Sequence, residues 1–402
     1  MAWDRKMTAV PSVGVAMSVY NQASIVGDAI ESLLCQTQPP EQIVIVDDGS
    51  TDGSPEVIAG YEKFGVQLVG LERRGVSEVL NRGASLLETD YVAIQAADDR
   101  SLPDRLEVEL DAAEQTGSAL VTALPRIIDM AGKVIPDDVA PEFFVHRDDE
   151  LHILRRLFET GNLLCASSAL IRRDAFDQVG GFHPRLLHLQ DHWLWTRLAG
   201  IASVTRLDDR LVEYRRNPDG GNLSSPANDH RMRVELGFCY RHFFDLVADD
   251  IFLEAFGDLI SGCNGTIDRD LEEALLFLGH TDPLVQQCGA DRLLMLTLDE
   301  DRRGSLDQRG LGPFAFFDAI GSVDVDRLLE RDSVQAAHDV AVAQRDSVQA
   351  AHDVAVAQRD SVQAAHDAAV AQRDSVQAAH DALIGSLTFR LTSLFRRLIG
   401  RN

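Results

Sequence analysis

Short apolar runs alternate with helix-like apolar spacing over the first third of the chain. The runs are rich in Val and Ile and indicate buried strands, whereas the segments between them space their apolar residues three and four positions apart, as one face of a helix does. The expected strands are Val13–Met17, Gln42–Val46, Gln67–Leu71 and Tyr91–Gln95, and the expected helices are Ser24–Cys35, Ser54–Phe64 and Val76–Leu87. Strands that alternate with helices of this length predict an α/β fold with a mostly parallel sheet.

The pattern becomes mixed after residue 125 and helical after residue 225. In the mixed part we expect a strand over Ala166–Ile171, a short helix over Arg173–Val179 and a further helix over Gln190–Leu198. The helical part is interrupted by glycines and prolines and carries no catalytic pattern. We therefore expect an α/β domain over residues 1–225 and an α-helical appendage over residues 226–330.

A fourteen-residue repeat fills residues 331–383, and its units begin at Arg331, Arg345, Arg359 and Arg373. Because each unit is two heptads long, the same face of a helix returns at every repeat. One seam alternates Val and Ala and its companion alternates Ala and Gln, so self-association between such helices is expected to be weak. The pattern predicts a helical rod of coiled-coil type, about 75 Å long. A lone solvated helix is the alternative.

The last segment, residues 384–402, reverses the charge of the chain. Ser386–Asn402 contains four arginines and no acid. Its apolar residues form one stripe on a helix: Leu387, Leu391, Leu394, Phe395 and Leu398. A basic amphipathic helix of this kind predicts peripheral contact with an anionic membrane surface. The alternative is a helix that docks on its own protein or on a partner chain.

The composition of the chain argues against some kinds of binding partner and some cellular compartments. The 402 residues carry 38 Lys and Arg against 64 Asp and Glu, a net charge of −26. We expect no nucleic-acid binding, because neutralising backbone phosphates needs a surplus of cations. The five cysteines are scattered without a CxxC pair, which argues against a disulfide scaffold or zinc ribbon. No apolar run is long enough to span a bilayer, and the first ten residues lack a signal-peptide core. We expect a soluble, cytoplasmic protein that meets the inner membrane surface only through its tail.

Polar residues gather where three of the expected strands end. The clusters are Ser18-Val19-Tyr20-Asn21, Asp47-Asp48-Gly49-Ser50-Thr51-Asp52 and Asp98-Asp99. Turn and capping preferences explain one such cluster, but three together indicate a crevice, because open α/β sheets bind ligands beyond the carboxyl ends of their strands. No GxGxxG turn follows the first strand, and no GxxxxGK[ST] loop is present. Paired carboxylates then favour a hard divalent cation shared with phosphate oxygens, which predicts a metal–nucleotide cleft.

These clusters and three further stretches carry a resemblance to a known family. The further stretches are Leu80-Asn81-Arg82-Gly83, Val179-Gly180-Gly181-Phe182 and Leu189-Gln190-Asp191-His192-Trp193. In this order and spacing, residues 1–220 resemble family 2 of the inverting glycosyltransferases, which has the GT-A fold. The resemblance implies a nucleotide-sugar site formed by Ser18, Tyr20, Asn21, Asp47, Asp48, Asn81 and Asp98. It also implies that Asp98 and Asp99 hold a metal ion and that Asp191 is the catalytic base.

Two positions depart from the family pattern. Ala96 stands where the family often has an Asp two places before Asp98, so either Mg²⁺ or Mn²⁺ fits the expectation. Gln190 stands where the family often has Glu before the base, but the base position itself, Asp191, is kept. The Gln-x-x-Arg-Trp signature of processive polysaccharide synthases is absent from the chain, which favours transfer of a single sugar.

The resemblance implies transfer from a nucleotide sugar, expected to be UDP-linked, to a saccharide or lipid-linked acceptor in surface polysaccharide synthesis. Trp193 and Trp195 are candidates to stack on a sugar and Arg215 to meet the diphosphate, although packing is the commoner role for such side chains. Two alternatives stay open. A sugar nucleotidyltransferase would be expected to carry a Gly-rich loop near its N-terminus, and none is present. A non-catalytic scaffold would carry a degenerate transferase domain.

Overall fold

The computed structural model describes residues 10–136, 152–216, 229–260 and 267–321, together with the single residues 323, 375 and 377. The chain divides into two compact units, Met1–Val323 and Asp324–Asn402. Of the predicted repeat rod, only Ser375 and Gln377 are described, and both are helical. The rest of the rod and the basic tail lie outside the described residues. The membrane contact and the cytoplasmic location therefore stay predictions.

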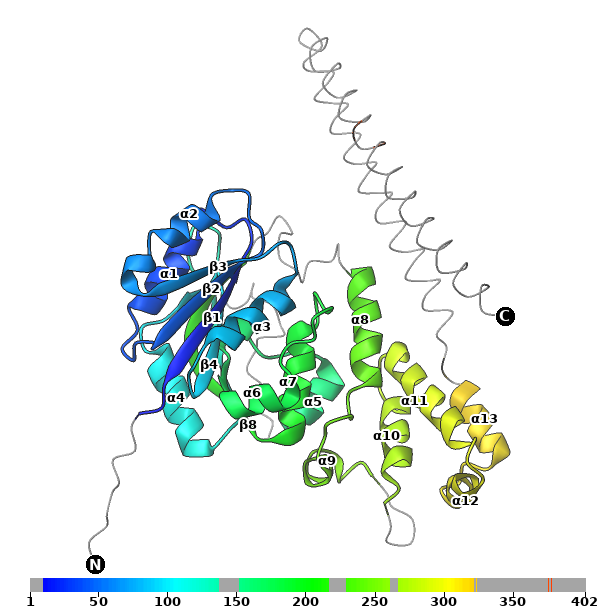
Figure 1. Ribbon diagram of the computed structural model, residues 1–402. Coiled ribbons are helices and arrows are strands. Elements are labelled where there is room, and N and C mark those ends of the chain that lie inside the picture. Colours follow the sequence, from blue (N-terminus) through cyan, green and yellow to red (C-terminus); the bar gives the residue numbers. More distant parts are fainter. Residues whose placement is uncertain are drawn as a thin grey trace, which may run out of the picture. The chain divides into compact units, whose positions relative to one another are not determined.

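One eight-stranded sheet organises the first unit, with strand order β3-β2-β1-β4-β7-β6-β8-β5. The first four strands in this order are parallel and are β3 (Val66–Gly70), β2 (Gln42–Asp47), β1 (Val13–Val19) and β4 (Tyr91–Ala96). Each lies within two residues of its predicted range. The predicted α/β architecture with a mostly parallel sheet is confirmed (Figure 1).

The other half of the sheet mixes directions. It contains β7 (Leu170–Arg172), β6 (Leu120–Ile128), β8 (Val204–Arg215) and β5 (Arg100–Ser101). β7 runs antiparallel to both β4 and β6, β5 is antiparallel to β8, and β6 and β8 are parallel.

The strand expected over Ala166–Ile171 is wrong in its first half, because Ala166–Ser168 forms a 3₁₀ turn. The Ser168 hydroxyl donates to the Ala123 carbonyl (2.9 Å) and accepts from the Ala123 N–H (3.0 Å). Side-chain hydrogen bonds of this kind replace strand pairing.

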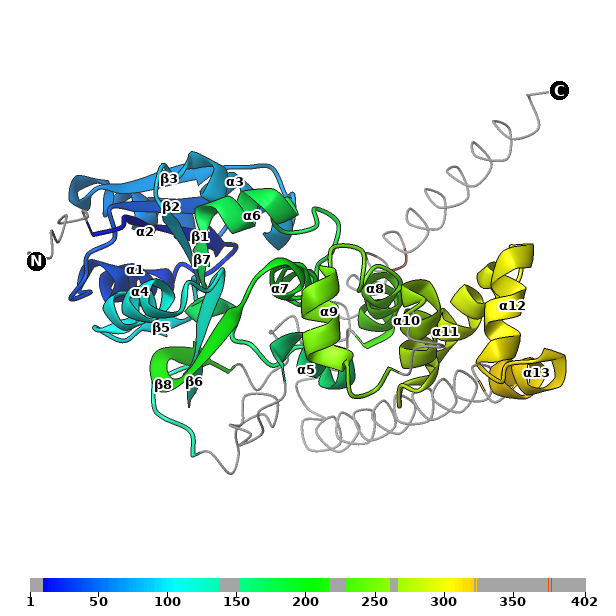
Figure 2. The same ribbon diagram turned by 90° about the horizontal axis from the view of Figure 1, so that it is seen from below.

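Helices cover both faces of the sheet because its central strands are apolar on both sides. Along β1, Val15 and Met17 face one core, while Ala16 faces the other. The first core lies under α1 (Val26–Leu34), α2 (Ser54–Ala59) and α4 (Arg105–Thr116), and α1 and α4 lie on the same face (Figure 2). The second core lies under α3 (Val76–Leu86), α5 (Ile153–Thr160), α6 (Arg173–Val179) and α7 (Gln190–Ile201). The helix expected over Ser54–Phe64 breaks at Gly60 and resumes as a 3₁₀ turn, η1 (Glu62–Phe64).

The helical region extends the second core. Its helices are α8 (Asp229–Arg241), α9 (Asp249–Phe256), α10 (Arg269–Leu278), α11 (Pro283–Leu296), α12 (Glu300–Gln308) and α13 (Pro313–Gly321). Phe158 of α5 lies within 6 Å, centroid to centroid, of the rings of Tyr240, Phe243, Phe244, Phe256 and Phe277. The boundary predicted between residues 225 and 226 therefore does not separate two compact units, because one aromatic core crosses it. Within the described residues, no helix is long and apolar enough to cross a membrane.

Candidate active site

The carboxyl ends of β2, β1 and β4 lie next to one another, so the three polar clusters meet at one edge of the sheet. Val19 pairs with Asp47 of β2, and the half-buried Ser18 pairs with Ala96 of β4. Neighbouring strands are about 4.8 Å apart. The structure thus brings the first two clusters, Ser18–Asn21 and Asp47–Asp52, alongside the Asp98-Asp99 pair, which follows β4 directly.

Asn21 joins the first two clusters. Its backbone has φ 52°, a left-handed conformation that Asn tolerates. The Asn21 Oδ1 accepts from the Thr51 N–H (2.8 Å), and the Asn21 N–H donates to Ser50 Oγ (2.9 Å). Asp47 Oδ2 accepts from the N–H groups of Gly49 (3.2 Å) and Ser50 (3.0 Å). The buried Asp47 Oδ1 has no hydrogen-bond partner among the described residues, which leaves one acceptor open in this loop.

Asp48 fixes the loop that follows β3. Its carboxylate, only 7% exposed, accepts from the backbone N–H groups of Arg74 (2.5 Å) and Gly75 (2.9 Å). In the same loop, the Arg73 guanidinium lies 3.5 Å from the centre of the exposed Tyr20 ring, a cation–π contact. The Asp48 carboxylate is therefore engaged by backbone in this structure, and Arg73 lies over the Tyr20 ring.

The Asp98-Asp99 pair lies in a tight turn. Asp99 is 1% exposed, and its carboxylate accepts from the Ser167 hydroxyl and from the Arg215 N–H (2.8 Å). Burial raises the pKa of Asp99 well above its usual range, and the neighbouring Asp98 carboxylate raises it further. Burial also raises the pKa of Asp98, which receives a hydrogen bond from the Gln22 side chain. Two adjacent carboxyls that burial holds toward protonation gain most from a nearby cation.

The donor set of this pair fits a hard divalent cation. Asp98 and Asp99 supply carboxylate oxygens, and Mg²⁺ and Mn²⁺ prefer oxygen ligands. No cluster of three or more His, Cys, Asp or Glu side chains forms a metal cage in the part of the chain that the structure describes. One or two carboxylates completed by phosphate oxygens is the usual arrangement for Mg²⁺ beside a nucleotide.

A buried polar network supports this turn from below. Gln95, which is fully buried, donates to the Asp99 carbonyl (2.9 Å) and accepts from the Arg105 guanidinium (2.9 Å). Arg105 also pairs with Glu109 one helical turn further along α4, and both side chains are fully buried. The network ties α4 to the end of β4, so the position of the carboxylate pair depends on a helix that the sequence did not predict.

Asp191 lies in the first turn of α7. Its Oδ2 accepts from the Asn162 side-chain amide (2.7 Å), and its Oδ1 accepts from the His192 N–H (2.7 Å). Burial raises the pKa of Asp191 to about 6. Burial also lowers the pKa of His192 to about 4, so the His192 ring is neutral. A carboxyl with a pKa near 6 is ionised at neutral pH and can still take up a proton, as a general base requires.

Residues 162–167 connect the two acidic sites. Asn162, at one end of this segment, donates to Asp191, and Ser167, at the other end, donates to Asp99. The Ser167 hydroxyl also accepts from the Ala96 N–H (3.2 Å) at the end of β4. The expected base and the expected metal ligands therefore lie at opposite ends of one six-residue segment.

Four other candidate side chains serve packing in this structure. Asn81 uses both ends of its amide on Phe182, accepting from its N–H (2.9 Å) and donating to its carbonyl (2.8 Å). Trp195 is fully buried, and the Trp193 ring contacts the Phe238 ring (5.3 Å between centroids) and the Arg197 guanidinium (4.4 Å).

Arg215, 3% exposed, is the fourth. It donates to the carbonyls of Asp98 (2.8 Å) and Met130 (2.8 Å). It holds the acidic turn in place rather than projecting its guanidinium from the surface.

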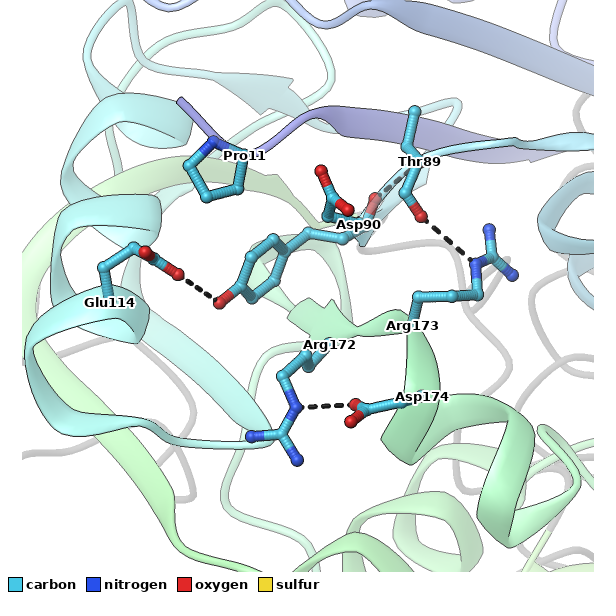
Figure 3. A pocket seen from close by; sticks show the side chains of 8 residues that line it. Pro11, Thr89, Asp90, Glu114, Arg172, Arg173 and Asp174 are labelled. Atoms are coloured by element: carbon cyan, nitrogen blue, oxygen red, sulfur yellow. Dashed lines mark hydrogen bonds and ion pairs between the residues drawn. The ribbon is translucent and has the colours of Figure 1, made fainter. Parts of the chain in front are cut away.

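A hollow of about 520 Å³ opens at the opposite, amino-terminal edge of β4 (Figure 3). Its polar groups are engaged within the protein. Arg172 pairs with Asp174 (2.6 Å), the Tyr91 hydroxyl donates to Glu114 (2.8 Å), and Arg173 donates to backbone carbonyls, Thr89 among them (3.4 Å). These contacts make the hollow a structural junction and leave the carboxyl edge as the candidate active site.

Comparisons with known proteins identify the family of this chain. The model of "Glycosyl transferase family 2" matches residues 14–180. The chain is 34% identical over 235 residues to the putative teichuronic acid biosynthesis glycosyltransferase TuaG of Bacillus subtilis, covering 58% of this chain and 88% of TuaG. It is 26% identical over 211 residues to the putative glycosyltransferase EpsH of Bacillus subtilis (51% of this chain, 61% of EpsH). It is 30% identical over 125 residues to the succinoglycan biosynthesis protein ExoO of Rhizobium meliloti (31% of this chain, 36% of ExoO).

Among solved structures, the mannosyltransferase PcManGT of Pyrobaculum calidifontis is 18% identical, with a TM-score of 0.49 over 80% of this chain and 88% of that one. The fold and the acidic edge define an α/β protein with a polar site at the carboxyl end of a mostly parallel sheet. The similarity to TuaG and the match to the family model identify the family: the chain belongs to glycosyltransferase family 2. The chain spans 61% of EpsH and 36% of ExoO, so only part of each of these two relatives is represented here.

Three residues of the site were missed by the sequence reasoning. Asn162 and Glu235 stand in segments without a motif, so nothing in the sequence distinguishes them from surface polar residues. Ser167 had a signal, because two adjacent serines interrupt an apolar run, but the run was interpreted as a strand. Glu235 of α8 accepts backbone hydrogen bonds from the segment before Asp191, a contact between parts that were expected to be separate.

Proposed function

We propose that this chain is an inverting glycosyltransferase that moves one sugar from a nucleotide-diphosphate donor to a hydroxyl of a saccharide or lipid-linked acceptor. The observation that carries the proposal is the placement of two distinct acidic sites at the ends of residues 162–167. One is a carboxyl pair suited to a cation, and the other is a carboxyl whose pKa of about 6 suits proton uptake. A direct displacement needs a base on the acceptor side of the reacting carbon and positive charge on the side of the leaving group.

In the proposed reaction the acceptor oxygen attacks the anomeric carbon while the bond from that carbon to the diphosphate oxygen breaks. The acceptor proton passes to the Asp191 carboxylate, and the bonding electron pair leaves with the diphosphate. Asn162 orients Asp191 through its amide, and the neutral His192 adds no positive charge that would lower the basicity of the carboxylate. Attack from the face opposite the leaving group inverts the configuration at the anomeric carbon.

Asp98 and Asp99 would hold Mg²⁺ or Mn²⁺, which supplies positive charge to the departing diphosphate. Asp47, with its open buried acceptor, and the neighbouring Ser18, Tyr20, Asn21 and Asp48 would surround the nucleotide. A bound donor would either displace the Arg73 guanidinium from the Tyr20 ring or stack beside this guanidinium. Asn81 would act indirectly, by holding the loop at Phe182.

Two relatives indicate the kind of product. Their names place ExoO in succinoglycan biosynthesis and TuaG, as a putative member, in teichuronic acid biosynthesis. We propose a role in the synthesis of a surface polysaccharide, with UDP-linked sugars as the first donors to test.

The first test replaces the proposed base. Asp191→Asn keeps the shape of the side chain but cannot take up the proton, so turnover should fall at least about a hundredfold. Donor affinity should stay within about threefold, because the base acts on the acceptor. Turnover is measured by product formation from a panel of nucleotide sugars and acceptors, and donor affinity by calorimetry. Comparable turnover in the variant would remove Asp191 from the mechanism.

A second test addresses the cation. Asp99→Asn can keep its hydrogen bonds to Ser167 and Arg215 but loses the charge, so metal-dependent turnover should fall about a hundredfold or more. The measurement is turnover against added Mg²⁺ or Mn²⁺, with thermal unfolding as the control for the fold. Wild-type turnover by this variant in the presence of a chelator would contradict the assignment.

A further inference from the structure

Helix α8 places a buried carboxylate against the segment that leads into the proposed base. Glu235, 8% exposed, accepts from the backbone N–H groups of Leu187 (3.1 Å), His188 (2.8 Å) and Leu189 (3.0 Å). Three successive N–H groups converging on one carboxylate form an anion-binding nest. The anion that fills the nest is supplied by the helical region rather than by the α/β part of the chain.

This contact sets the start of α7. Leu189 is the residue before the helix and has no side chain that could cap the free N–H groups. Glu235, from another helix, accepts the N–H of this Leu189, and its negative charge lies at the positive end of the α7 dipole. Asp191 is the second residue of α7, so the conformation of residues 187–189 determines where its carboxylate lies.

The groups around Asp191 come from three elements. Asn162 precedes the 3₁₀ turn, the His192 N–H belongs to α7, and Glu235 and Cys239 belong to α8. Burial raises the pKa of the Cys239 thiol to about 12, so this thiol is neutral. Burial is the largest cause of the raised pKa of Asp191, and the negative charge of Glu235 raises this pKa further.

We propose that Glu235 is a positioning residue for the transfer reaction: it clamps residues 187–189 and thereby aims the Asp191 carboxylate at the acceptor hydroxyl. The helical region is then part of the active site. This inference rests on the proposed role of Asp191 as the base. If Glu235 were only a structural cap, its loss would lower stability without lowering the kcat of the folded protein.

The experiment compares wild type with Glu235→Gln, which removes the charge, and Glu235→Asp, which keeps the charge on a shorter side chain. Glu273→Gln is the matched control, because Glu273 is also a buried carboxylate of the helical region but pairs with Arg269 and Arg292 instead. Two quantities are measured for each folded variant. One is the titration of Asp191, from the carboxyl ¹³C signals of Asp-labelled protein assigned with Asp191→Asn, and the other is kcat with donor affinity.

In Glu235→Gln the Asp191 titration should move to lower pH by about half a unit or more, because a like charge is lost and water gains access. Its kcat should fall about ten- to a hundredfold, with donor affinity within about threefold. Glu235→Asp should keep the titration near wild type while kcat falls, and Glu273→Gln should change neither. An unchanged Asp191 titration in Glu235→Gln overturns the inference, as does an unchanged kcat. Absence of transfer by wild type would overturn the proposed function instead, and the titration would still show whether the clamp acts on Asp191.

Discussion

The acidic side chains of the candidate active site are held by hydrogen bonds from the protein itself. Asp47 accepts backbone N–H groups of its own loop, Asp48 accepts those of the loop after β3, and Asp99 accepts one from Arg215. Asp191 accepts the His192 N–H and the Asn162 amide. Fixed donors of this kind hold carboxylates in place without the cost of reorganising water during the reaction.

The raised pKa of Asp191 predicts a pH profile. The base must be ionised, so kcat/KM should be lost as pH falls through about 6, with a tenfold decrease for each further unit. The measurement is kcat/KM between pH 5 and 8 at saturating metal. An acid limb below pH 5 would contradict the environment described for this carboxyl.

The same shift predicts a gain in stability on mutation. Folding raises the pKa of Asp191 from 3.8 to about 6, so between these values the native protein holds a proton that the unfolded chain has released. The contribution of Asp191 to stability therefore falls as pH rises through this window. Asp191→Asn should melt at a higher temperature than wild type at pH 7.5, and the difference should shrink toward pH 4. A lower melting temperature at pH 7.5 would argue against a net cost for this buried charge.

At the scale of elements, the sequence predicted strands better than it predicted what supports them. β1, β2 and β4 were predictable because both of their faces are buried, which makes them continuous apolar runs. Helix α4 was missed because its first two turns carry Arg105 and Glu109, which resemble solvent-facing charges but are fully buried. The clustering of polar residues at strand ends was predictable, whereas Asn162 and Ser167 became part of the site only through tertiary contacts.

The buried network of α4 predicts that replacing Arg105 and replacing Glu109 lower the free energy of unfolding by different amounts. Arg105→Leu removes the guanidinium that donates to the buried Glu109 carboxyl and to the buried Gln95 side chain, so the free energy of unfolding should fall by about 3–5 kcal/mol. Glu109→Gln should cost less, about 1–2 kcal/mol, because burial already raises the pKa of Glu109 to about 8 and the change to an amide removes little charge. Urea unfolding of both variants measures the difference, and equal losses would contradict this account.

At the scale of the molecule, the α/β part and the helices after residue 229 share one aromatic core. A chain ending at residue 225 would expose Phe158 and the neighbouring faces of α5 and α7. We expect residues 1–225 to be insoluble or to unfold without cooperativity, whereas residues 1–323 should melt cooperatively and bind donor as the full chain does. Soluble yield and calorimetry of the two truncations test this expectation. Cooperative unfolding of the shorter chain near the wild-type temperature would show that the core does not depend on the helices.

Because each face of the sheet packs into its own core, the two cores are completed at different times during translation. The face under α1, α2 and α4 closes with side chains from Val13 to Leu170, so it is complete once that stretch has emerged. The opposite face needs residues as late as Cys288. At about 5–20 residues per second, translation from Leu170 to Cys288 takes on the order of ten seconds. During that interval the nascent chain presents a half-covered apolar sheet, which is the kind of surface that chaperones bind.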